Sequence, residues 1–387
     1  MPRNRKVALA LASSVVILTA THVAAAGDMD LTPERLVTQP AGAIGQAPGG
    51  CQQIAANTAA YQNAPGFPQI AACLPNNVAW ANLMSELGMA IAPSAFHAAR
   101  TTGLGGFALS LEATYTHINS SNSAGGIQYW HAGTQGPTDP NTGKFSTVNA
   151  DPDSLLQVYT VKARKGLAYG FEITGALGYI ANTSLWVGGA DFHWALLEGY
   201  RTGFLGYLPD LAVGTGVRTV GGSSKFFLTT VGIDAQISKP FVLDDSAVLT
   251  PYVGAQYVLI YANSSVVDLA PNADALGQCG YEGTNVPGNP YANPKGPFTG
   301  APVCANKLAN GADNNAAFNN DTTFNKADIK RWRGIVGVNY RFEVLYLAGQ
   351  FATELGDLNG ENGGASGPLG GAGAKQWSTS FEAGVSF

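Results

Sequence analysis

Apolar and polar residues alternate along most of this chain, in segments of about ten residues each. The clearest segment alternates Trp332, Val338 and Tyr340 with Arg333 and Arg341. Neighbouring side chains of a β-strand point to opposite faces, so this period predicts strands with one apolar and one polar face. A soluble β-sandwich would show the same alternation, and the pattern alone does not separate it from a membrane barrel.

Ten such segments are predicted, and each is bounded by turn-forming residues. They span residues 107–116, 155–164, 171–179, 186–196, 211–218, 227–237, 252–261, 331–342, 345–354 and 377–387. The predicted fold class is therefore all-β: an antiparallel transmembrane β-barrel of about ten strands, preceded by an irregular, partly helical N-terminal segment. One overlooked hairpin would make twelve strands. Pro251 is expected just before the seventh segment, because proline is tolerated at a strand start.

The connections between the segments favour the barrel. If the first strand runs outward, the connections after odd-numbered strands are external, and they include every long one. The external connections are about 119–153, 181–185, 219–225, 262–328 and 356–375, and the turns are about 165–170, 198–209, 238–248 and 343–344. Bacterial barrels keep short turns on the periplasmic side and long loops outside, so the lengths agree with an even strand count.

The first 26 residues predict an export signal, with a basic start, an apolar run over 7–20 and the small-residue cleavage site Ala24–Ala26. The apolar run is shorter than the roughly 20 residues of a spanning helix. We therefore expect a signal peptide at 1–26, an N-terminal plug or periplasmic extension at 27–103, and a transmembrane barrel at 104–387.

Composition agrees with this prediction. Only 12% of the residues are charged, 49 are glycine and 10% are aromatic, which suits a barrel better than a soluble α/β enzyme. The net charge of −5 and the lack of a basic cluster argue against a nucleic-acid partner.

The last segment resembles the C-terminal assembly signal of bacterial outer-membrane β-barrels. That signal has a terminal aromatic residue with apolar residues at alternate positions before it, and here Trp377, Phe381, Val385 and Phe387 fill the pattern. The resemblance implies a porin-like barrel in a Gram-negative outer membrane, with outer-membrane lipid and the barrel-assembly machinery as partners. Residues 87–106 are faintly similar to the entry of the first strand in the long-chain fatty-acid transporter family.

Residues 27–103 lack a strand pattern, and short helices are expected at Gln52–Tyr61 and Val78–Ala92. This segment either fills the lumen or extends into the periplasm. Many inward positions of the barrel are small, which leaves space for a chain, water or a solute.

Charges of both signs are expected on the inner face. These candidates for a selectivity constriction are Glu112, Lys162, Arg164, Glu172, Asp191, His193, Arg218, Asp234, Arg331, Arg333, Arg341 and Glu354. The alternative is a network of ion pairs that stiffens the barrel, because buried charges need partners. Asp191 and His193 share one strand face, yet no nucleophile is identifiable beside them, so an enzyme is not predicted.

Four cysteines, in an exported and oxidising context, predict two disulfides with three possible pairings. The favoured pairing is Cys51–Cys73 and Cys279–Cys304, since each pair lies in one irregular segment. No metal site and no cofactor are predicted. The sequence thus favours a porin-like channel or transporter for passive movement of a small-molecule solute. A structural or adhesive surface barrel, acting through its external loops, is the alternative, and a fatty-acid-type hydrophobic transporter is the third possibility.

Overall fold

The computed structural model describes most of the barrel and part of the N-terminal segment. The described residues are 29–38, 43–46, 52–55, 69–72, 74–94, 98–121, 123–124, 127–130, 152–199, 208–244, 246–268, 279–281, 302–304, 321–356, 362, 364–371 and 373–387. The predicted signal at 1–26 and the predicted Cys51–Cys73 disulfide lie outside these residues.

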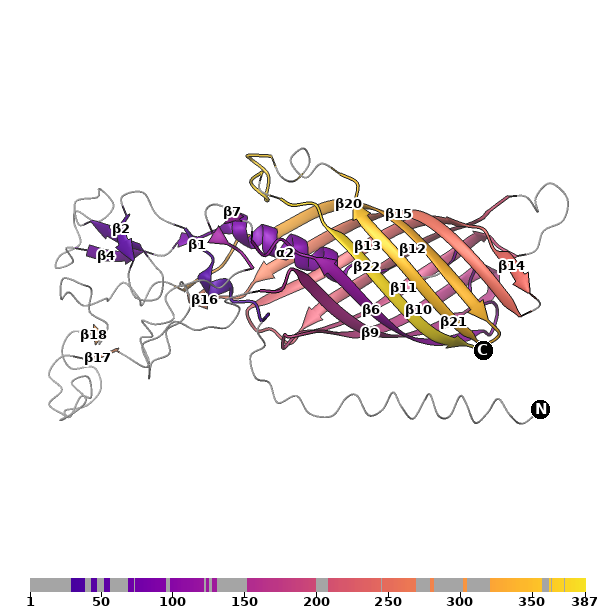
Figure 1. The fold of residues 1–387 in the computed structure, drawn as a ribbon. Helices are drawn as coiled ribbons and strands as arrows, with labels where there is room; N and C mark the ends of the chain where they lie inside the picture. The colour runs from indigo at the N-terminus through magenta and orange to yellow at the C-terminus, as the bar shows by residue number, and fades with distance from the viewer. Residues whose placement is uncertain are drawn as a thin grey trace.

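Within these ranges, ten long strands form a closed antiparallel barrel (Figure 1). Each pairs with its neighbours in sequence, and the last pairs with the first, which closes the ring. The ten strands are β6 (Phe107–His117), β9 (Leu155–Gly166), β10 (Phe171–Ile180), β11 (Trp186–Leu197), β12 (Asp210–Gly221), β13 (Phe226–Ser238), β15 (Ala247–Ser264), β20 (Ala327–Phe342), β21 (Leu345–Glu354) and β22 (Trp377–Ser386). The predicted fold class and strand number are confirmed.

The clearest departures from the predicted bounds are the starts of β15 and β20, which begin at Ala247 and Ala327 and not at 252 and 331. β15 begins at Ala247, so Pro251 lies inside the strand and not just before it. A short strand outside the ring, β14 (Phe241–Asp244), pairs with the first residues of β15. β13 pairs with β15 from Tyr252 onward. Pro251 lies between the residues that pair with β14 and those that pair with β13. A proline has no backbone N–H to donate, and at this position neither strand is in register to accept one.

Exposure alternates along the barrel strands as the period-two pattern requires. On β6, Leu109 and Leu111 are exposed on the outer wall, whereas Ser110 and Glu112 are buried inside. A ring without a free edge satisfies the backbone hydrogen bonds of every strand, and its apolar outer wall suits a hydrocarbon environment. The wall is thus apolar outside and polar inside.

Exposed aromatic residues gather near both ends of the wall. The long connections leave one end of the barrel, called here the long-loop end, and the short turns join strands at the other, the short-turn end. Exposed rings near the long-loop end are Tyr179, Trp186, Tyr261 and Trp377, and those near the short-turn end are Phe107, Tyr169, Trp194, Phe342 and Phe387. Such belts are typical of membrane–water interfaces.

The predicted second helix is present as α2 (Asn77–Ile91). Its first turn is capped by Asn76, whose side chain accepts a hydrogen bond of 2.9 Å from the backbone N–H of Ala79. Pro93 follows shortly after its last residue, where a proline stops a helix. No helix in the part of the chain that the structure describes has the length and apolar character needed to cross a membrane.

The predicted helix at Gln52–Tyr61 is wrong for its described part, and the segment does contain strands. Residues 52–55 form the middle strand of a small three-stranded sheet, because their backbone pairs on both sides. The short elements are η2 (Pro33–Arg35), β1 (Val37–Thr38), β2 (Ala43–Gln46), β3 (Gln52–Ala55), β4 (Gln69–Ala72), β5 (Leu74–Pro75), β7 (Ser123–Ala124), β8 (Ile127–Gln128), η3 (Ala168–Gly170), β16 (Val267–Asp268), β17 (Cys279–Tyr281), β18 (Pro302–Cys304) and β19 (Asp321–Thr322).

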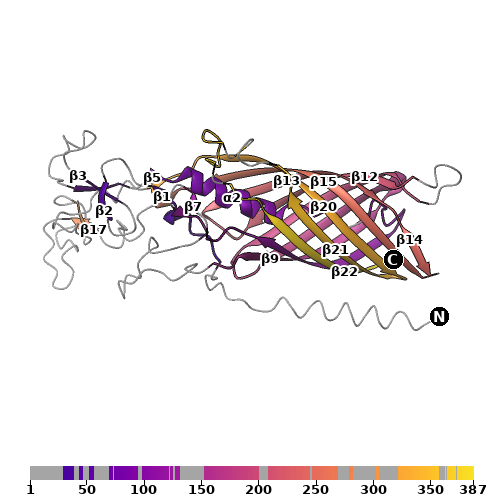
Figure 2. The same ribbon diagram turned by 45° about the horizontal axis from the view of Figure 1, so that its top comes forward.

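The N-terminal segment approaches the barrel from its long-loop end. Figures 1 and 2 show α2 at the mouth opposite the C-terminus, with its far end inside the ring. Residues 29–38 lie at the same end, where the backbone N–H of Met29 donates to the carbonyl of Asn182 in the β10–β11 hairpin, 2.9 Å away. The chain then runs through the lumen and turns at 103–106 into β6 at the short-turn end.

Candidate functional site

The lumen is the candidate site, because it holds the N-terminal segment and most of the predicted charges. Residues 77–106, called here the lumen segment, contact inward side chains at three successive depths, excepting the undescribed 95–97.

At the long-loop end, Glu86 of α2 is buried and binds the connection that follows β6. Its carboxylate accepts hydrogen bonds from the backbone N–H of Asn119 at 3.0 Å, the Tyr129 hydroxyl at 2.8 Å and the Trp130 indole N–H at 2.5 Å. Burial raises the pKa of Glu86 above its usual value of 4.5, against the opposing effect of these donors. Burial also raises the pKa of the Tyr129 hydroxyl. Glu86 therefore fastens α2 to an external connection.

Close to Glu86, Arg331 joins α2 to two barrel strands. Its guanidinium pairs with Glu354 on β21, with Nε 2.7 Å from Oε1, and Nη1 donates to the hydroxyl of Ser85 at 3.0 Å and to the side-chain oxygen of Gln376 at 2.6 Å. The side chains of Arg331 and Glu354 are fully buried. Breaking a buried pair of this kind strongly destabilises a fold, since it leaves one charge uncompensated.

At mid-depth, α2 has ended, and backbone carbonyl groups of the residues that follow it accept hydrogen bonds from the wall. Arg333 donates to the carbonyl oxygen of Pro93 at 2.6 Å and to the side chain of Gln256 at 2.8 Å. Gln256 also donates to the carbonyl of Pro93, at 3.0 Å. The irregular backbone after α2 thus has partners inside the ring, as buried backbone groups require.

The next residue of the lumen segment, Ser94, enters a buried ion cluster. Its hydroxyl donates to the carboxylate of Glu112 at 3.0 Å and accepts from Lys162 at 2.8 Å. Lys162 pairs directly with Glu112 and lies 3.6 Å from Glu382. Arg164 lies 3.6 Å from Glu382 and 4.0 Å from Glu172. Both signs of charge therefore meet across β6, β9, β10 and β22.

Near the short-turn end, the lumen segment binds the wall through backbone N–H groups. The N–H of Thr101 donates to Glu198 at 2.9 Å, and that of Thr102 donates to Glu172 at 2.7 Å. Arg100 pairs with the buried Asp210 at the start of β12, with Nε and Oδ2 2.6 Å apart. The described residues of the lumen segment are therefore bound to the wall at both ends and at mid-depth.

A further group of predicted residues lies on β11, β12 and β13. Asp191 accepts two hydrogen bonds of 2.7 Å from Arg218. The ring of His193 lies 3.3 Å from the carbonyl of Ala99 and 3.4 Å from the amide nitrogen of Gln236. Asp234 lines a small cavity beside them. Asp191 and His193 thus both take part in the polar contacts of the lumen.

Glycine at two positions allows the lumen segment to lie this close to the wall. A Cβ at Gly216 on β12 would stand 2.9 Å from a side-chain carbon of Pro93, and one at Gly88 would stand 2.5 Å from Ile260 on β15. Real Cβ contacts are almost never this short, so a side chain at either position would push the segment away.

The space left between the lumen segment and the wall is small. Three cavities there have volumes of about 20, 10 and 20 Å³. Each holds no more than a water molecule. Around these three cavities, the lumen is occupied by side chains and by the lumen segment.

Arg341 departs from the predicted lumen set. Its side chain is exposed, and its Nε donates to the backbone carbonyl of Glu343 at 3.0 Å in the β20–β21 turn. Because Arg341 lies next to the last residue of β20, its long side chain reaches past the wall at the short-turn end. The other eleven predicted candidates lie on inward positions of the strands.

The predicted assembly signal and the second disulfide fall partly within the described chain. On β22, Trp377 and Phe381 are exposed on the outer wall, and Phe387 follows the strand's end. Cys279 and Cys304 are register partners in the β17–β18 pair. Recognition by the assembly machinery and the disulfides stay predictions.

The sequence did not identify several residues that take part in these contacts, either on the lumen segment or on the barrel that surrounds it. They are Glu86, Pro93, Ser94, Tyr129, Trp130, Gln256 and Gln376. The signal for Glu86 was present, because it is the one charged residue in the apolar sequence of α2. A lone charge on a helix without a polar face indicates a buried partner.

No family model matches the chain, and no curated protein matches it. Two solved structures of Ail, the attachment invasion locus protein of Yersinia pestis, align with this chain at 8% identity and a TM-score of 0.23. Each alignment includes 73% of this chain and 99% of the Ail chain. OccK8 (OprE) of Pseudomonas aeruginosa covers 66% of this chain and 70% of that chain at 10% identity, with a TM-score of 0.13. Likenesses this weak identify neither a family nor a role, and the predicted likeness to fatty-acid transporters is not shown.

Proposed function

We propose that this protein is an outer-membrane barrel of a Gram-negative cell that is sealed by its own lumen segment and presents its N-terminal residues at the cell surface. The membrane location is supported by the closed ring, the apolar outer wall and the two belts of exposed aromatic residues. An export signal and the barrel-assembly machinery as a partner belong to the same proposal.

The observation that carries the proposed role is the path of residues 77–106. They run through the lumen from the long-loop end to the short-turn end and bind the wall at each depth described. The cavities beside them, of about 20 Å³ each, have room for no more than a single water molecule. Because bacterial barrels place long loops outside, we place the described residues between 29 and 76 on the external side of the membrane.

An epitope test examines the display directly. One epitope is inserted after Thr38, and a matched control epitope is inserted in the turn after Glu343 at the short-turn end. We expect antibody to bind the first on intact cells and the second only after permeabilisation. The reverse result, or equal labelling of both on intact cells, would contradict the proposed orientation.

A planar-bilayer measurement examines the seal. We expect purified wild-type protein to give no steady single-channel current. Steady conductance steps of a water-filled pore would remove the sealed state from the proposal.

A solute channel that opens when the lumen segment moves is a second candidate, and it is favoured by the polar lumen. Lys162, Arg164 and Arg333 would line such a passage with Glu112 and Glu382. This composition suits polar solutes, whereas a fatty-acid-type passage needs an apolar lining. Appearance of conductance in the Glu86→Ala variant, with none in wild type, would favour this candidate.

A further inference from the structure

The peptide bond between Pro93 and Ser94 lies among groups of the kind that cleave peptide bonds. The carbonyl oxygen of Pro93 accepts hydrogen bonds from Nη2 of Arg333 at 2.6 Å and from Nε2 of Gln256 at 3.0 Å. Two such donors stabilise the negative charge that develops on a carbonyl oxygen when a nucleophile adds to its carbon. The donors therefore form an oxyanion hole around the protein's own backbone.

The hydroxyl next to this carbonyl has a base within hydrogen-bond distance. Oγ of Ser94 donates to the carboxylate of Glu112, with both carboxylate oxygens 3.0 Å away. Thr114 donates to the same carboxylate at 2.7 Å and orients it, and Lys162 donates to Oγ of Ser94 at 2.8 Å. A nucleophile, a base and a group that orients the base are the set that acyl transfer requires.

Arg333 is a buried cation whose charge the intact chain leaves uncompensated. Other buried cations of the lumen lie within 4.0 Å of a carboxylate oxygen, namely Lys162, Arg164, Arg218 and Arg331. Among the described residues, Arg333 has no such partner and binds neutral oxygens of Ala92, Pro93 and Gln256. A buried charge without a partner is costly. Breaking the bond after Pro93 places a carboxylate at the oxygen that Arg333 already binds.

Water has room beside this bond. A cavity of about 20 Å³ is lined by Ser94, Glu112 and Arg333, and a second cavity of about 20 Å³ is lined by Pro93 and Ser94. Each has space for one water molecule. The nucleophile and the donors to the carbonyl therefore lie beside a space that can supply the second reactant.

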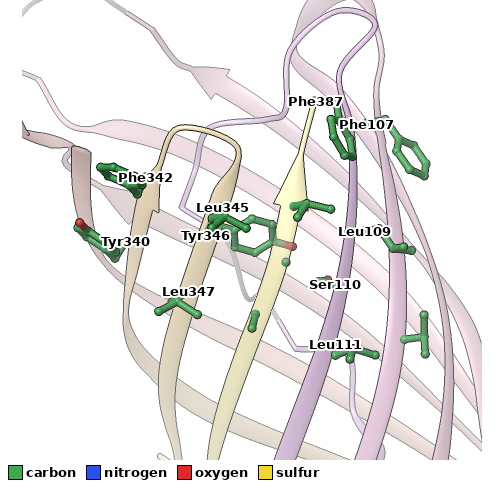
Figure 3. Close-up of a pocket in the computed structure, with 14 residues that line it drawn as sticks. Phe107, Leu109, Ser110, Leu111, Tyr340, Phe342, Leu345, Tyr346, Leu347 and Phe387 are labelled. Carbon is green, nitrogen blue, oxygen red and sulfur yellow. The ribbon is translucent and has the colours of Figure 1, made fainter. Parts of the chain in front are cut away.

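The wall of the barrel separates these groups from its outer surroundings. Glu112 lies on the inner face of β6, and its neighbour Leu111 lies on the outer face. Figure 3 shows that outer face at the short-turn end, where Leu109 and Leu111 line an apolar groove. Because β6 and β22 are paired without interruption from Ser378 to Ser386, the reacting water comes from the lumen.

We propose that the protein cleaves its own chain between Pro93 and Ser94. Oγ of Ser94 adds to the carbonyl carbon of Pro93 and Glu112 takes the hydroxyl proton, while Arg333 and Gln256 bind the negative oxygen. The bond from this carbon to the nitrogen of Ser94 then breaks. Glu112 gives the proton to the nitrogen, and the acyl group is left as an ester on Oγ.

Water from the adjacent cavity hydrolyses this ester. The water oxygen bonds to the carbonyl carbon, the bond from that carbon to Oγ breaks, and Oγ takes one proton of the water. The new carboxyl group gives its proton to the freed amine. The products are a carboxylate on Pro93, bound by Arg333, and an α-ammonium group on Ser94 beside Glu112.

Cleavage alone does not release the N-terminal part, because α2 keeps its own contacts. Glu86, Ser85 and the carbonyl of Gly88 still bind the barrel. The N-terminal part therefore stays attached through α2 without a covalent link. The inference does not rest on the proposed orientation in the membrane, because the bond lies inside the ring.

The test follows the chain from the moment it folds. The full-length chain is collected unfolded from inclusion bodies, refolded into detergent, and analysed at intervals by denaturing gel, intact mass spectrometry and N-terminal sequencing. We expect wild type to convert to two chains, one ending at Pro93 and the other beginning at Ser94. The rate should not depend on protein concentration, because all reacting groups belong to one molecule.

Variants of the nucleophile separate self-cleavage from other causes. Ser94→Ala removes the hydroxyl and should remain a single chain, whereas Ser94→Thr keeps a hydroxyl and should cleave. Thr230→Val is the matched control, because it removes a different hydroxyl that binds the lumen segment, at the carbonyl of Gly88. This control should cleave at the wild-type rate.

Gln256→Glu tests the oxyanion hole. It keeps an acceptor for Arg333 but loses the N–H that binds the carbonyl of Pro93, so its cleavage should be about 100-fold slower. Gel mobility with and without heating shows that each variant is folded. A folded wild type that remains one chain overturns the proposal. Cleavage at the same bond in folded Ser94→Ala also overturns it, because a contaminating protease would then be the cause.

Discussion

Replacing Glu86 with alanine tests how α2 is held at the mouth of the barrel. The carboxylate accepts three hydrogen bonds there, from Asn119, Tyr129 and Trp130. Alanine leaves their donors buried without an acceptor, at about 1–3 kcal/mol each. Relief of the cost of burying the carboxylate offsets part of this loss. We expect local opening of α2 to become easier by about 3 kcal/mol, or about 150-fold.

Glu86→Gln is the matched control. The carboxylate oxygen Oε2 accepts from both Asn119 and Trp130, and Oε1 accepts from Tyr129. A glutamine carbonyl at the first position keeps two of these bonds, and its amide can donate to the Tyr129 oxygen at the second. We expect this variant to lose less than about 1 kcal/mol.

Hydrogen exchange followed by mass spectrometry measures the opening. Peptides that cover residues 77–94 and 118–130 should exchange much faster in Glu86→Ala than in wild type, whereas peptides from β11 and β12 serve as the internal reference. The reasoning is refuted if both sets of peptides are unchanged in Glu86→Ala, or if Glu86→Gln is as damaging as alanine.

Three further predictions can be tested on the same purified protein. Because burial raises the pKa of Glu86, the folded state binds its proton more tightly than the unfolded state, so the hold on α2 is strongest below about pH 4.5 and weakens as pH rises through the folded-state pKa. Intrinsically corrected exchange of α2 should follow this trend in wild type and lose it in Glu86→Gln. Gly88→Ala should loosen α2 by about 1–3 kcal/mol because its Cβ meets Ile260, and hydrogen exchange of α2 should return toward the wild-type rate when Ile260→Ala is added. Cys279 and Cys304 should appear as one disulfide-linked peptide pair before reduction; alkylation of both thiols without reductant would disprove the link.

The barrel was predictable from sequence because its cause is local. One face of each strand meets an apolar environment and the other face does not, so each segment alternates apolar and polar residues, as in 331–342. The start of β15 was not predicted because a proline usually marks the limit of a strand. Pro251 is tolerated inside β15 because the neighbouring strands β13 and β14 leave a gap in their pairing beside it, and the sequence around Pro251 does not show this gap.

The lumen contacts were predictable only in kind. The period identified Glu112, Lys162 and Arg331 as inward, yet it gives a face and not a partner. Partners come from ring closure, which brings β6 beside β22, and from the path of the lumen segment. Ser94 and Pro93 bind through one hydroxyl and one carbonyl, and neither leaves a periodic pattern in the sequence.

The path of the chain through the ring also constrains the order of assembly. Residues 29–38 lie at one mouth and β6 starts at the other, so the chain between them passes through the lumen, and the cavities left beside it have room for no more than single waters. A ring that closed first would need α2 and the residues before it to pass through the lumen from the short-turn end. We therefore expect the β22–β6 seam to close around a helix already in place, so that insertion into the bilayer and packing of the interior would form a single step.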